Sequence, residues 1–492
     1  LASYFYRRAE KAAPQISLLS RVAVLVAGAI CIGLCLFGIR GRMGYNPIKV
    51  SQAYYCEDPF LNQLGVNPVF NLLTSTLDDN RKENRTLHLM SEEDALSKVQ
   101  KYLHRQGIDR LSPIARKVER EGTPNRRNVV LVFMESMSAN LMGTFGSDKK
   151  LTPYLDSLYQ QSLSFSHFYS SGIHTNHGIY STLYSFPAIM KRNAMKGSVI
   201  PVYSGLPTVL QENGYCNLFF MTHESQYDNM NAFLRTNGFD EIYAQENYPS
   251  EKVVNSFGVQ DDFMYQYALP ILNERAGTGN PFFSVLLSIS NHPPYVIPPY
   301  FHPHSDVLEE QIVEYADWSI RQFMQAAEKQ PWFDNTIFVF LGDHGKMVGT
   351  PECEMPQSYN HIPLMIYGKD IKPGVYDGFG GQVDVSPTLL GLLNISYLQN
   401  NFGVNLLEEE RPCMFFTADN LIGARDSVNM FIYSPDSQQE FKYKLEEGKL
   451  HAATGTDEEA FRNLKDYCFS MLQSTESLVK EHKTLDKVSV KK

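Results

Sequence analysis

The chain has 492 residues, of which 43% are hydrophobic and 20% charged, a balance typical of a folded protein with two or three domains. The formal net charge of -10 and an isoelectric point near 5.8 argue against nucleic-acid binding, because they imply no basic surface that could neutralise phosphates. The seven cysteines are too scattered for a disulfide framework or a zinc knuckle.

Residues 22–39 predict a transmembrane helix. This segment has no charged residue, is bounded by Arg21 and Arg40, and is just long enough to span a bilayer. A cleaved signal peptide is the alternative, but basic residues lie well ahead of the segment and the chain begins with Leu1 rather than Met. We therefore interpret residues 1–44 as a membrane-proximal segment of a longer membrane protein. Basic residues flank both ends of the span, so charge does not settle its orientation.

Residues 45–122 are interpreted as a linker that contains one helix. Its first part is rich in Asn, Pro, Tyr and Gln, which suits a segment lying over another domain. Ser91 followed by three acidic residues predicts a helix start, and the apolar spacing through Leu103 continues the helix until Gly107. The polar stretch 119–128, with Gly122 and Pro124, is the expected boundary of the next domain.

Residues 123–410 predict an α/β domain with a mostly parallel sheet sandwiched between helices. Continuous apolar runs, typical of strands buried on both faces, alternate with helix-length segments. The runs are 129–134, 218–221, 282–289, 336–341 and 364–367, and the helical segments include 154–162, 207–213 and 315–329. From residue 411 shorter pieces predict a small antiparallel β region, followed after Asp457 by a charged helical tail.

The run 336–341 ends in Gly342-Asp343-His344-Gly345, which predicts a metal site. Ligands in parallel sheets bind at the carboxyl ends of strands, and the glycines let the carboxylate and imidazole approach one ion together. A turn with an aspartate cap and a surface histidine is the alternative.

Glu135 follows the run 129–134 and is expected at the same sheet edge as Asp343 and His344, so that three ligands converge. The alternative is a carboxylate at a helix N-terminus, where the helix dipole favours it.

The segment 170–178 places hydroxyls and imidazoles between two glycines, just ahead of an apolar helical stretch. A helix N-terminus there would bind an anion, and Thr175 is the candidate nucleophile. No Ser/His/Asp triad is recognisable, so a metal ion would have to activate the alcohol. A polar helix cap is the alternative for this segment.

Two further histidines, His292 and His223, each follow an apolar run. Either one alone is more often a satisfied loop or core residue than a catalytic one. Together with Glu135 and the Asp343-His344 pair, however, they would all open onto one rim of the sheet, which favours an active site there.

In their order along the chain, Glu135-Ser136, the Thr175 segment, Asn291-His292-Pro293-Pro294-Tyr295 and Gly342-Asp343-His344-Gly345 resemble lipoteichoic acid synthase-like phosphoglycerol transferases. That group belongs to the sulfatase and alkaline phosphatase superfamily, and the similarity covers roughly residues 125–400. The chain is also similar to the Gram-negative relatives that move phosphoglycerol onto periplasmic glucans.

The resemblance implies that Glu135, Thr175, Asp343 and His344 hold one divalent ion, usually Mn²⁺ in this family, with Mg²⁺ or Zn²⁺ as alternatives. It also implies that Thr175 is the covalent nucleophile and that His292 contacts the phosphate or protonates the leaving group. The family's last membrane helix precedes an extracytoplasmic catalytic domain, which implies a plasma-membrane or inner-membrane protein with residues 45–492 outside the cytoplasm.

The chain departs from the family beyond His223. Lipoteichoic acid synthases carry a Phe-Trp-Asn-Arg stretch there, whereas this chain reads Gln226-Tyr227-Asp228-Asn229-Met230, without the arginine associated with glycerol phosphate. The expected substrate contacts are stacking on Tyr227 and hydroxyl binding by His223 or Asp228. His361, which precedes another strand, is a further candidate, with a structural loop histidine as the alternative.

The leading hypothesis is a membrane-anchored transferase that takes glycerol phosphate from an anionic phospholipid and passes it to a glycan, glycolipid or polymer acceptor. Tethering at the bilayer favours a lipid donor. A phosphoethanolamine transferase is the closest alternative, followed by a phosphodiesterase or sulfatase. No Cys/Ser-x-Pro-x-Arg motif of sulfatases lies near Thr175. A membrane-anchored binding protein on a degenerate fold is the alternative that involves no catalysis.

Overall fold

The computed structural model describes residues 17–43, 47–56, 59–79, 81, 84, 86–108, 111–197, 200–446, 448–453 and 458–486. Contacts divide the chain into two units, Leu1–Gln52 and Ala53–Lys492. The first 16 residues of the expected membrane-proximal segment, the start of the expected linker at Tyr45 and the expected tail boundary at Asp457 lie outside the described residues.

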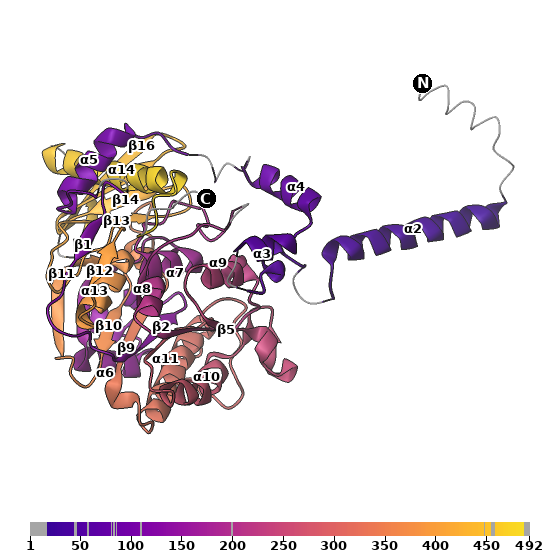
Figure 1. Cartoon of the computed structure of the whole chain (residues 1–492), viewed down its shortest axis with the longest axis horizontal. Helices are drawn as coiled ribbons and strands as arrows, with labels where there is room; N and C mark the ends of the chain where they lie inside the picture. The colour runs from indigo at the N-terminus through magenta and orange to yellow at the C-terminus, as the bar shows by residue number, and fades with distance from the viewer. Residues whose placement is uncertain are drawn as a thin grey trace. The chain divides into compact units, whose positions relative to one another are not determined.

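The first unit contains the long apolar helix α2 (Leu18–Arg40), labelled in Figure 1. The Ser17 hydroxyl accepts a hydrogen bond from the Ser20 N–H at its start, and Gly41 ends it in the left-handed region at φ 77°. Its 23 residues rise about 34 Å, which exceeds the thickness of a hydrocarbon core, and none of them is buried. The helix predicted at 22–39 is thus confirmed and is slightly longer, and by length and composition it could cross a membrane.

An eight-stranded sheet is the centre of the second unit, in the order β11-β3-β10-β9-β2-β8-β4-β5. Only β10 runs against its neighbours, so the sheet is mostly parallel, as predicted. The strands are β2 (Asn128–Met134), β3 (Leu163–Tyr169), β4 (Cys216–Met221), β5 (Glu241–Tyr243), β8 (Phe282–Leu287), β9 (Thr336–Gly342), β10 (Leu364–Tyr367) and β11 (Gly374–Gly381).

Helices cover both faces of this sheet (Figure 1). On one face α6 (Pro153–Gln161), α10 (Asp261–Ala276) and α11 (Leu308–Ala327) pack on alternate side chains of β2, β4 and β9 in a continuous apolar core. On the other face α7 (Thr175–Tyr184), α8 (Leu206–Glu212) and α13 (Val385–Leu392) contact one another. The central strands β2 and β9 are buried along their whole length, which explains their uninterrupted apolar sequences.

A second, five-stranded antiparallel sheet forms the C-terminal region, in the order β13 (Met414–Thr417), β14 (Ile422–Arg425), β15 (Asn429–Ser434), β16 (Gln439–Glu446) and β17 (Lys449–Ala452). The helix expected after it as a charged tail is α14 (Glu458–Lys480), and it is not a free tail. Phe461 and Leu464 are buried, as is every residue from Tyr467 to Leu478, and α14 packs on β14, β15 and α5 (Glu92–Tyr102).

Helix α5 begins at the predicted cap, Ser91, but ends at Tyr102 rather than near Gly107. His104 at φ 51° turns the backbone out of the helix, and Gly107 takes a left-handed conformation in a separate turn. Because α5 packs on α14, the segment interpreted as a linker contributes to the C-terminal region. The other α-helices of the described residues are α3 (Pro59–Leu64), α4 (Pro68–Asp79), α9 (Met230–Thr236) and α12 (Gln357–Asn360). Two further strand pairs are β1 (Arg116–Val118) with β12 (Tyr397–Gln399), and β6 (Val253–Asn255) with β7 (Gly258–Val259).

A buried ion pair joins the C-terminal region to the α/β core. The Arg411 guanidinium donates to the Asp384 carboxylate, to the Phe402 carbonyl at 2.9 Å and to the Tyr467 hydroxyl at 3.0 Å. Asp384 also accepts from the Gly381 and Val404 N–H groups. Every charge is therefore paired although both side chains are almost completely enclosed.

We expect Arg411→Met to lower the free energy of unfolding by about 3–5 kcal/mol, because it leaves the Asp384 charge buried without its partner. Denaturant unfolding followed by circular dichroism measures this difference. The control is Lys369→Met, which removes a surface partner of Asp334 and should cost at most about 1 kcal/mol. An equal loss of unfolding free energy in the two variants would contradict a stabilising role of the Arg411–Asp384 ion pair.

Candidate active site

The carboxyl ends of the central strands bring the first two acidic side chains together. Met134 at the end of β2 pairs with Gly342 at the end of β9, so Glu135 and Asp343 leave the sheet at the same level. A side chain at position 342 would clash with the Met137 carbonyl oxygen, 2.6 Å from its Cβ. Glycine is therefore needed where the two turns cross.

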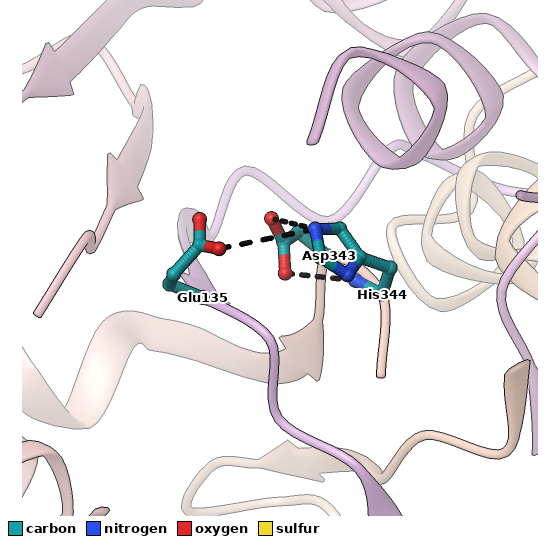
Figure 2. Close-up of side chains that lie close together, drawn as sticks. All are labelled: Glu135, Asp343 and His344. Carbon is teal, nitrogen blue, oxygen red and sulfur yellow. Dashed lines mark hydrogen bonds and ion pairs between the residues drawn. The ribbon is translucent and has the colours of Figure 1, made fainter. Parts of the chain in front are cut away.

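Glu135, Asp343 and His344 form one compact cluster, shown in Figure 2. One ligand atom from each lies within 4.8 Å of the others, and His344 Nε2 is 3.8 Å from Glu135 Oε1 and 3.6 Å from Asp343 Oδ2. The three groups that sequence reasoning placed at one rim thus lie together.

The hydrogen bonds of Asp343 leave one oxygen available for a cation. Its Oδ1 accepts from the N–H groups of Ser136 at 2.8 Å and of His344 at 2.7 Å. Its Oδ2 is buried and has no hydrogen-bond partner. A buried, unpartnered carboxylate oxygen is costly unless a positive charge faces it, so these residues fit a divalent ion.

A backbone carbonyl and a hydroxyl fix the orientation of the other two candidate ligands. His344 Nδ1 donates to the Gly345 carbonyl at 2.8 Å, which directs Nε2 towards the carboxylates. The Ser136 hydroxyl donates to Glu135 Oε1 at 2.8 Å. Two carboxylates and an imidazole suit Mn²⁺, Mg²⁺ or Zn²⁺, and they do not choose among these metals.

Burial raises the pKa of Glu135 well above its ordinary value, and the negative charge of Asp343 raises it further. Two adjacent carboxylates in so dry a place oppose each other's ionisation. A bound cation would reverse this effect, so the cluster is most stable as a metal site.

Thr175 reaches the cluster from a different part of the fold. It is the first residue of α7, and its Oγ1 donates to Glu135 Oε2 at 3.4 Å. The close approach depends on Gly178, because a Cβ at that position would lie 2.3 Å from the Asp343 carbonyl oxygen. The hydroxyl therefore sits at a helix N-terminus, where free N–H groups favour an anion.

The cluster opens into a cavity of about 290 Å³. Its wall comes from the loops after β2, β3, β4, β8 and β9, which all reach the same sheet edge. The lining residues are Ser136, Ile173, His174, Thr175, Asn176, His223, Tyr227, Asp228, Ile289, His292, Pro293 and His344.

His292 and His223 both line the cavity. His292 Nδ1 donates to the Pro293 carbonyl at 2.7 Å, and its ring lies 4.2 Å from that of Phe257. His223 is buried, with Nδ1 bonded to the Glu224 carbonyl and Nε2 lacking a hydrogen-bond partner. Burial lowers the pKa of His223, which favours the uncharged ring.

Tyr227 and Asp228 belong to a turn that also lines the cavity. Asp228 at φ 49° and Asn229 at φ 68° occupy the left-handed region, which directs the Asp228 carboxylate towards α7. That carboxylate accepts from the Asn176 amide and from the Lys196 ammonium, both at 3.0 Å. The Tyr227 ring lies 4.8 Å from that of His223.

His361, the remaining predicted contact, is not among the residues that line this cavity. Its ring stacks on Tyr169 at 5.3 Å and meets the edge of Phe145 at 5.2 Å, and its Nε2 donates to the Ser166 carbonyl at 2.9 Å. This environment favours the structural alternative for His361.

Sequence analysis gave no role to three residues that support the site through backbone groups and neighbouring side chains. The Asn291 amide donates to the carbonyls of Glu135 and Ser136, both at 3.2 Å, and Lys346 Nζ donates to Asn291 Oδ1 at 2.6 Å. Burial lowers the pKa of Lys346 to about 8. Gln382 donates to the Gly342 and Asp343 carbonyls and accepts from the Ser171 N–H. The nearness of Asn291 to His292 and of Lys346 to His344 was the available signal.

The chain matches one family model and several known proteins. The family model described as Sulfatase matches residues 127–395. The chain is 25% identical to "Lipoteichoic acid synthase-like YvgJ" of Bacillus subtilis over 362 residues, which are 67% of this chain and 56% of that protein. It is 24% identical to a lipoteichoic acid synthase of Staphylococcus aureus over 400 residues, 72% of this chain and 58% of that one.

Solved structures share the fold. A protein of the alkaline phosphatase superfamily from Vibrio parahaemolyticus matches with a TM-score of 0.72 and 25% identity, over 80% of this chain and 97% of that one. The lipoteichoic acid synthase LtaP of Listeria monocytogenes matches with a TM-score of 0.63 and 22% identity, over 78% and 98%. The chain spans little more than half the length of the two synthase relatives matched by sequence.

We expect metal removal to destabilise the protein. A chelator should lower the melting temperature of the wild type, because Glu135 and Asp343 then face each other without a cation. Mn²⁺ at a hundred times its dissociation constant should restore about 2.7 kcal/mol. Asp343→Asn should lose this response, as measured by calorimetry and thermal unfolding. The exposed Glu119→Gln is the control and should respond like the wild type. If Mn²⁺ stabilised Asp343→Asn as much as the wild type, this would contradict the metal site.

We expect His361→Gln to change acid stability rather than catalysis. Burial, assisted by Arg425 and His167, lowers the pKa of His361 to about 4. The folded protein therefore binds fewer protons than the unfolded chain, and it loses up to about 3 kcal/mol as pH falls from about 6.5 to 4. The variant should show a flatter acid limb in unfolding measured against pH, with KM within about threefold of the wild type. A large rise in KM without a change in that limb would indicate a substrate contact instead.

Proposed function

The chain belongs to the sulfatase family, and on that basis we propose that it is a membrane-anchored, metal-dependent phosphoglycerol transferase. It takes glycerol phosphate from phosphatidylglycerol and passes it to a glycan, glycolipid or polymer acceptor. The names of its relatives support this activity, and the apolar helix α2 supports an anchor in the plasma or inner membrane. The resemblance to the family is the ground for placing the catalytic unit outside the cytoplasm.

The observation that carries the proposal is the position of Thr175. Its hydroxyl lies at the N-terminus of α7, next to Glu135, on the wall of a cavity that also contains His292. An alcohol held at a helix N-terminus beside a metal-ligand cluster is suited to attack phosphorus, because the N–H groups stabilise the negative oxygens of the phosphoryl group.

In the first half of the reaction, Thr175 Oγ1 forms a bond to phosphorus, and the bond from phosphorus to the diacylglycerol oxygen breaks. Glu135 Oε2 is the nearest acceptor for the threonine proton. The diacylglycerol oxygen takes its proton from His292 Nε2, which requires the ring to enter this step protonated on both nitrogens, because Nδ1–H is held by the Pro293 carbonyl. In the second half an acceptor hydroxyl forms a bond to phosphorus and gives its proton to His292 Nε2, while the bond from phosphorus to Thr175 Oγ1 breaks and Thr175 recovers its proton from Glu135.

Glu135, Asp343, His344 and Thr175 would hold the ion, and Mn²⁺ is the proposed metal. When bound, the ion lowers the pKa of a coordinated alcohol and offsets charge on the phosphoryl oxygens. The protein's own contribution is to keep the ligands oriented through the Gly345 carbonyl, the Ser136 hydroxyl and the backbone N–H groups on Asp343 Oδ1.

The charges around Asp228 favour glycerol over ethanolamine as the headgroup. An ethanolamine ammonium needs a carboxylate, but Asp228 already accepts from Lys196 and Asn176. The unpartnered Nε2 of His223 offers a neutral contact that suits a glycerol hydroxyl. Tyr227 packs beside this histidine and completes the pocket.

We expect Thr175→Ala to lower diacylglycerol release from labelled phosphatidylglycerol by about a thousandfold or more, because the nucleophile is lost. Wild-type enzyme quenched with acid during turnover should carry one phosphoglycerol unit on the Thr175 peptide, as read by mass spectrometry. The matched control is Thr182→Ala on the same helix, whose hydroxyl is buried without a hydrogen-bond partner and should be dispensable for catalysis.

The same experiment decides between headgroups. Enzyme incubated with phosphatidylglycerol and phosphatidylethanolamine together should acquire only the phosphoglycerol adduct. A phosphoethanolamine adduct would overturn the proposed donor, and full activity of Thr175→Ala would overturn the covalent mechanism.

A further inference from the structure

Outside α2, exposed apolar side chains of the described residues gather on α4 and the preceding α3. Five apolar side chains of α4 are between 49% and 68% exposed, and two leucines of α3 are 41% and 69% exposed. They are Val69, Phe70, Leu72, Leu73 and Leu77 on α4, with Leu61 and Leu64 on α3. Contiguous apolar exposure of this kind marks an interaction surface.

The apolar residues of α4 lie on one face of the helix. Val69, Leu73 and Leu77 recur every four residues, and Phe70 and Leu72 flank this row. Asn71, Thr74 and Ser75 fall on the opposite side, where they are less exposed than the apolar residues. The helix is therefore amphipathic, and its apolar face is the more exposed one.

Helix α4 satisfies its own polar groups. The Asn67 carboxamide oxygen accepts from the N–H groups of Val69 and Phe70, at 3.0 and 3.1 Å. The Thr74 hydroxyl donates to the Phe70 carbonyl at 2.9 Å, and the Thr76 hydroxyl donates to the Leu72 carbonyl at 2.7 Å. A helix with such local bonding can place its apolar face in a poorly hydrated environment without losing hydrogen bonds.

The chain's organisation points to lipid as the occupant of this face. Helix α2 ends at Arg40 and α4 begins at Pro68, so the intervening segment can reach at most about 90 Å. No charged residue occurs between Pro59 and Leu77, which removes the ion pairs that a soluble partner or an anionic headgroup would use. Hydrocarbon at a bilayer surface requires neither.

We propose that α4, together with Leu61 and Leu64, lies flat in the interface of the membrane crossed by α2, with its apolar face towards the acyl chains. The binding is hydrophobic rather than electrostatic. It holds the catalytic unit at the surface from which a lipid substrate would be drawn, independently of the chemistry at Thr175.

The test compares two tryptophan variants of the full chain in phosphatidylcholine vesicles whose acyl chains carry bromine. Leu73→Trp lies on the apolar face, and Ser75→Trp lies two residues away on the opposite face of the same turn. Signal from Trp318 and Trp332 is subtracted with the wild type. Leu73→Trp should be quenched at least about twofold more than Ser75→Trp. Phe70→Trp repeats the measurement if Leu73→Trp folds poorly.

Each outcome is decisive. Equal quenching of the two faces, or protection of Leu73→Trp by a second copy of the chain or another protein segment, overturns the proposal. Quenching that persists at high salt and without anionic lipid supports hydrophobic insertion, and its loss at high salt overturns it.

An activity assay separates this inference from the proposed function. The double variant Leu72→Gln with Leu73→Gln should lower turnover of vesicle lipid several-fold and leave turnover of a short-chain, water-soluble donor unchanged. Equal effects on both donors would contradict the surface role. If the wild type turned over neither donor, the proposed function would fail, and the quenching experiment would still decide the membrane contact.

Discussion

Glu135 and Asp343 lie at the ends of adjacent strands, each almost fully enclosed, where like charges repel with little water to screen them. Such a pair persists in a folded protein only if a cation binds to the two carboxylates or one of them keeps its proton. The surrounding contacts match the first case, because the backbone saturates Asp343 Oδ1 and leaves Oδ2 without a partner. The parallel sheet with level strand ends is what makes this arrangement possible.

Much of the fold could be predicted because its central strands are buried on both faces. β2, β4, β8, β9 and β10 appear in the sequence as short, mainly apolar runs, which are typical of strands buried on both faces. β3 was missed because Ser164, Ser166 and His167 interrupt it, and β11 because its glycines do not resemble a strand. β8 stops at Leu287, earlier than predicted, because the Ile289 and Ser290 N–H groups bond to the buried Asp261 carboxylate. The reversed direction of β10 depends on long-range pairing that no local pattern encodes.

The candidate site, like the fold, could be predicted from the sequence only in part. Glu135, Asp343 and His344 could be placed together because each directly follows a strand, and Thr175 because glycines and a helix start flank it. His361 also lies next to a strand, yet it packs between aromatic rings, since proximity in sequence does not specify the direction of a side chain. Residues such as Asn291 and Gln382 support the ligands through carbonyl groups, which carry no sequence signal of their own.

Gln382 belongs to the short helix η9 (Gln382–Asp384), which connects the site to the buried ion pair of Asp384 with Arg411. At one end of η9, Gln382 bonds to the carbonyls of Gly342 and Asp343 and to the N–H of Ser171, so it fixes the β9 turn and the loop before Thr175 relative to each other. At the other end, Asp384 is held by Arg411, which also bonds to Tyr467 of α14. The candidate metal ligands and Thr175 come from segments far apart in the sequence, and the proposed transfer reaction requires them to keep their spacing. Tyr467 of α14, which is not one of the candidate metal ligands, therefore helps to hold η9 in place through Arg411.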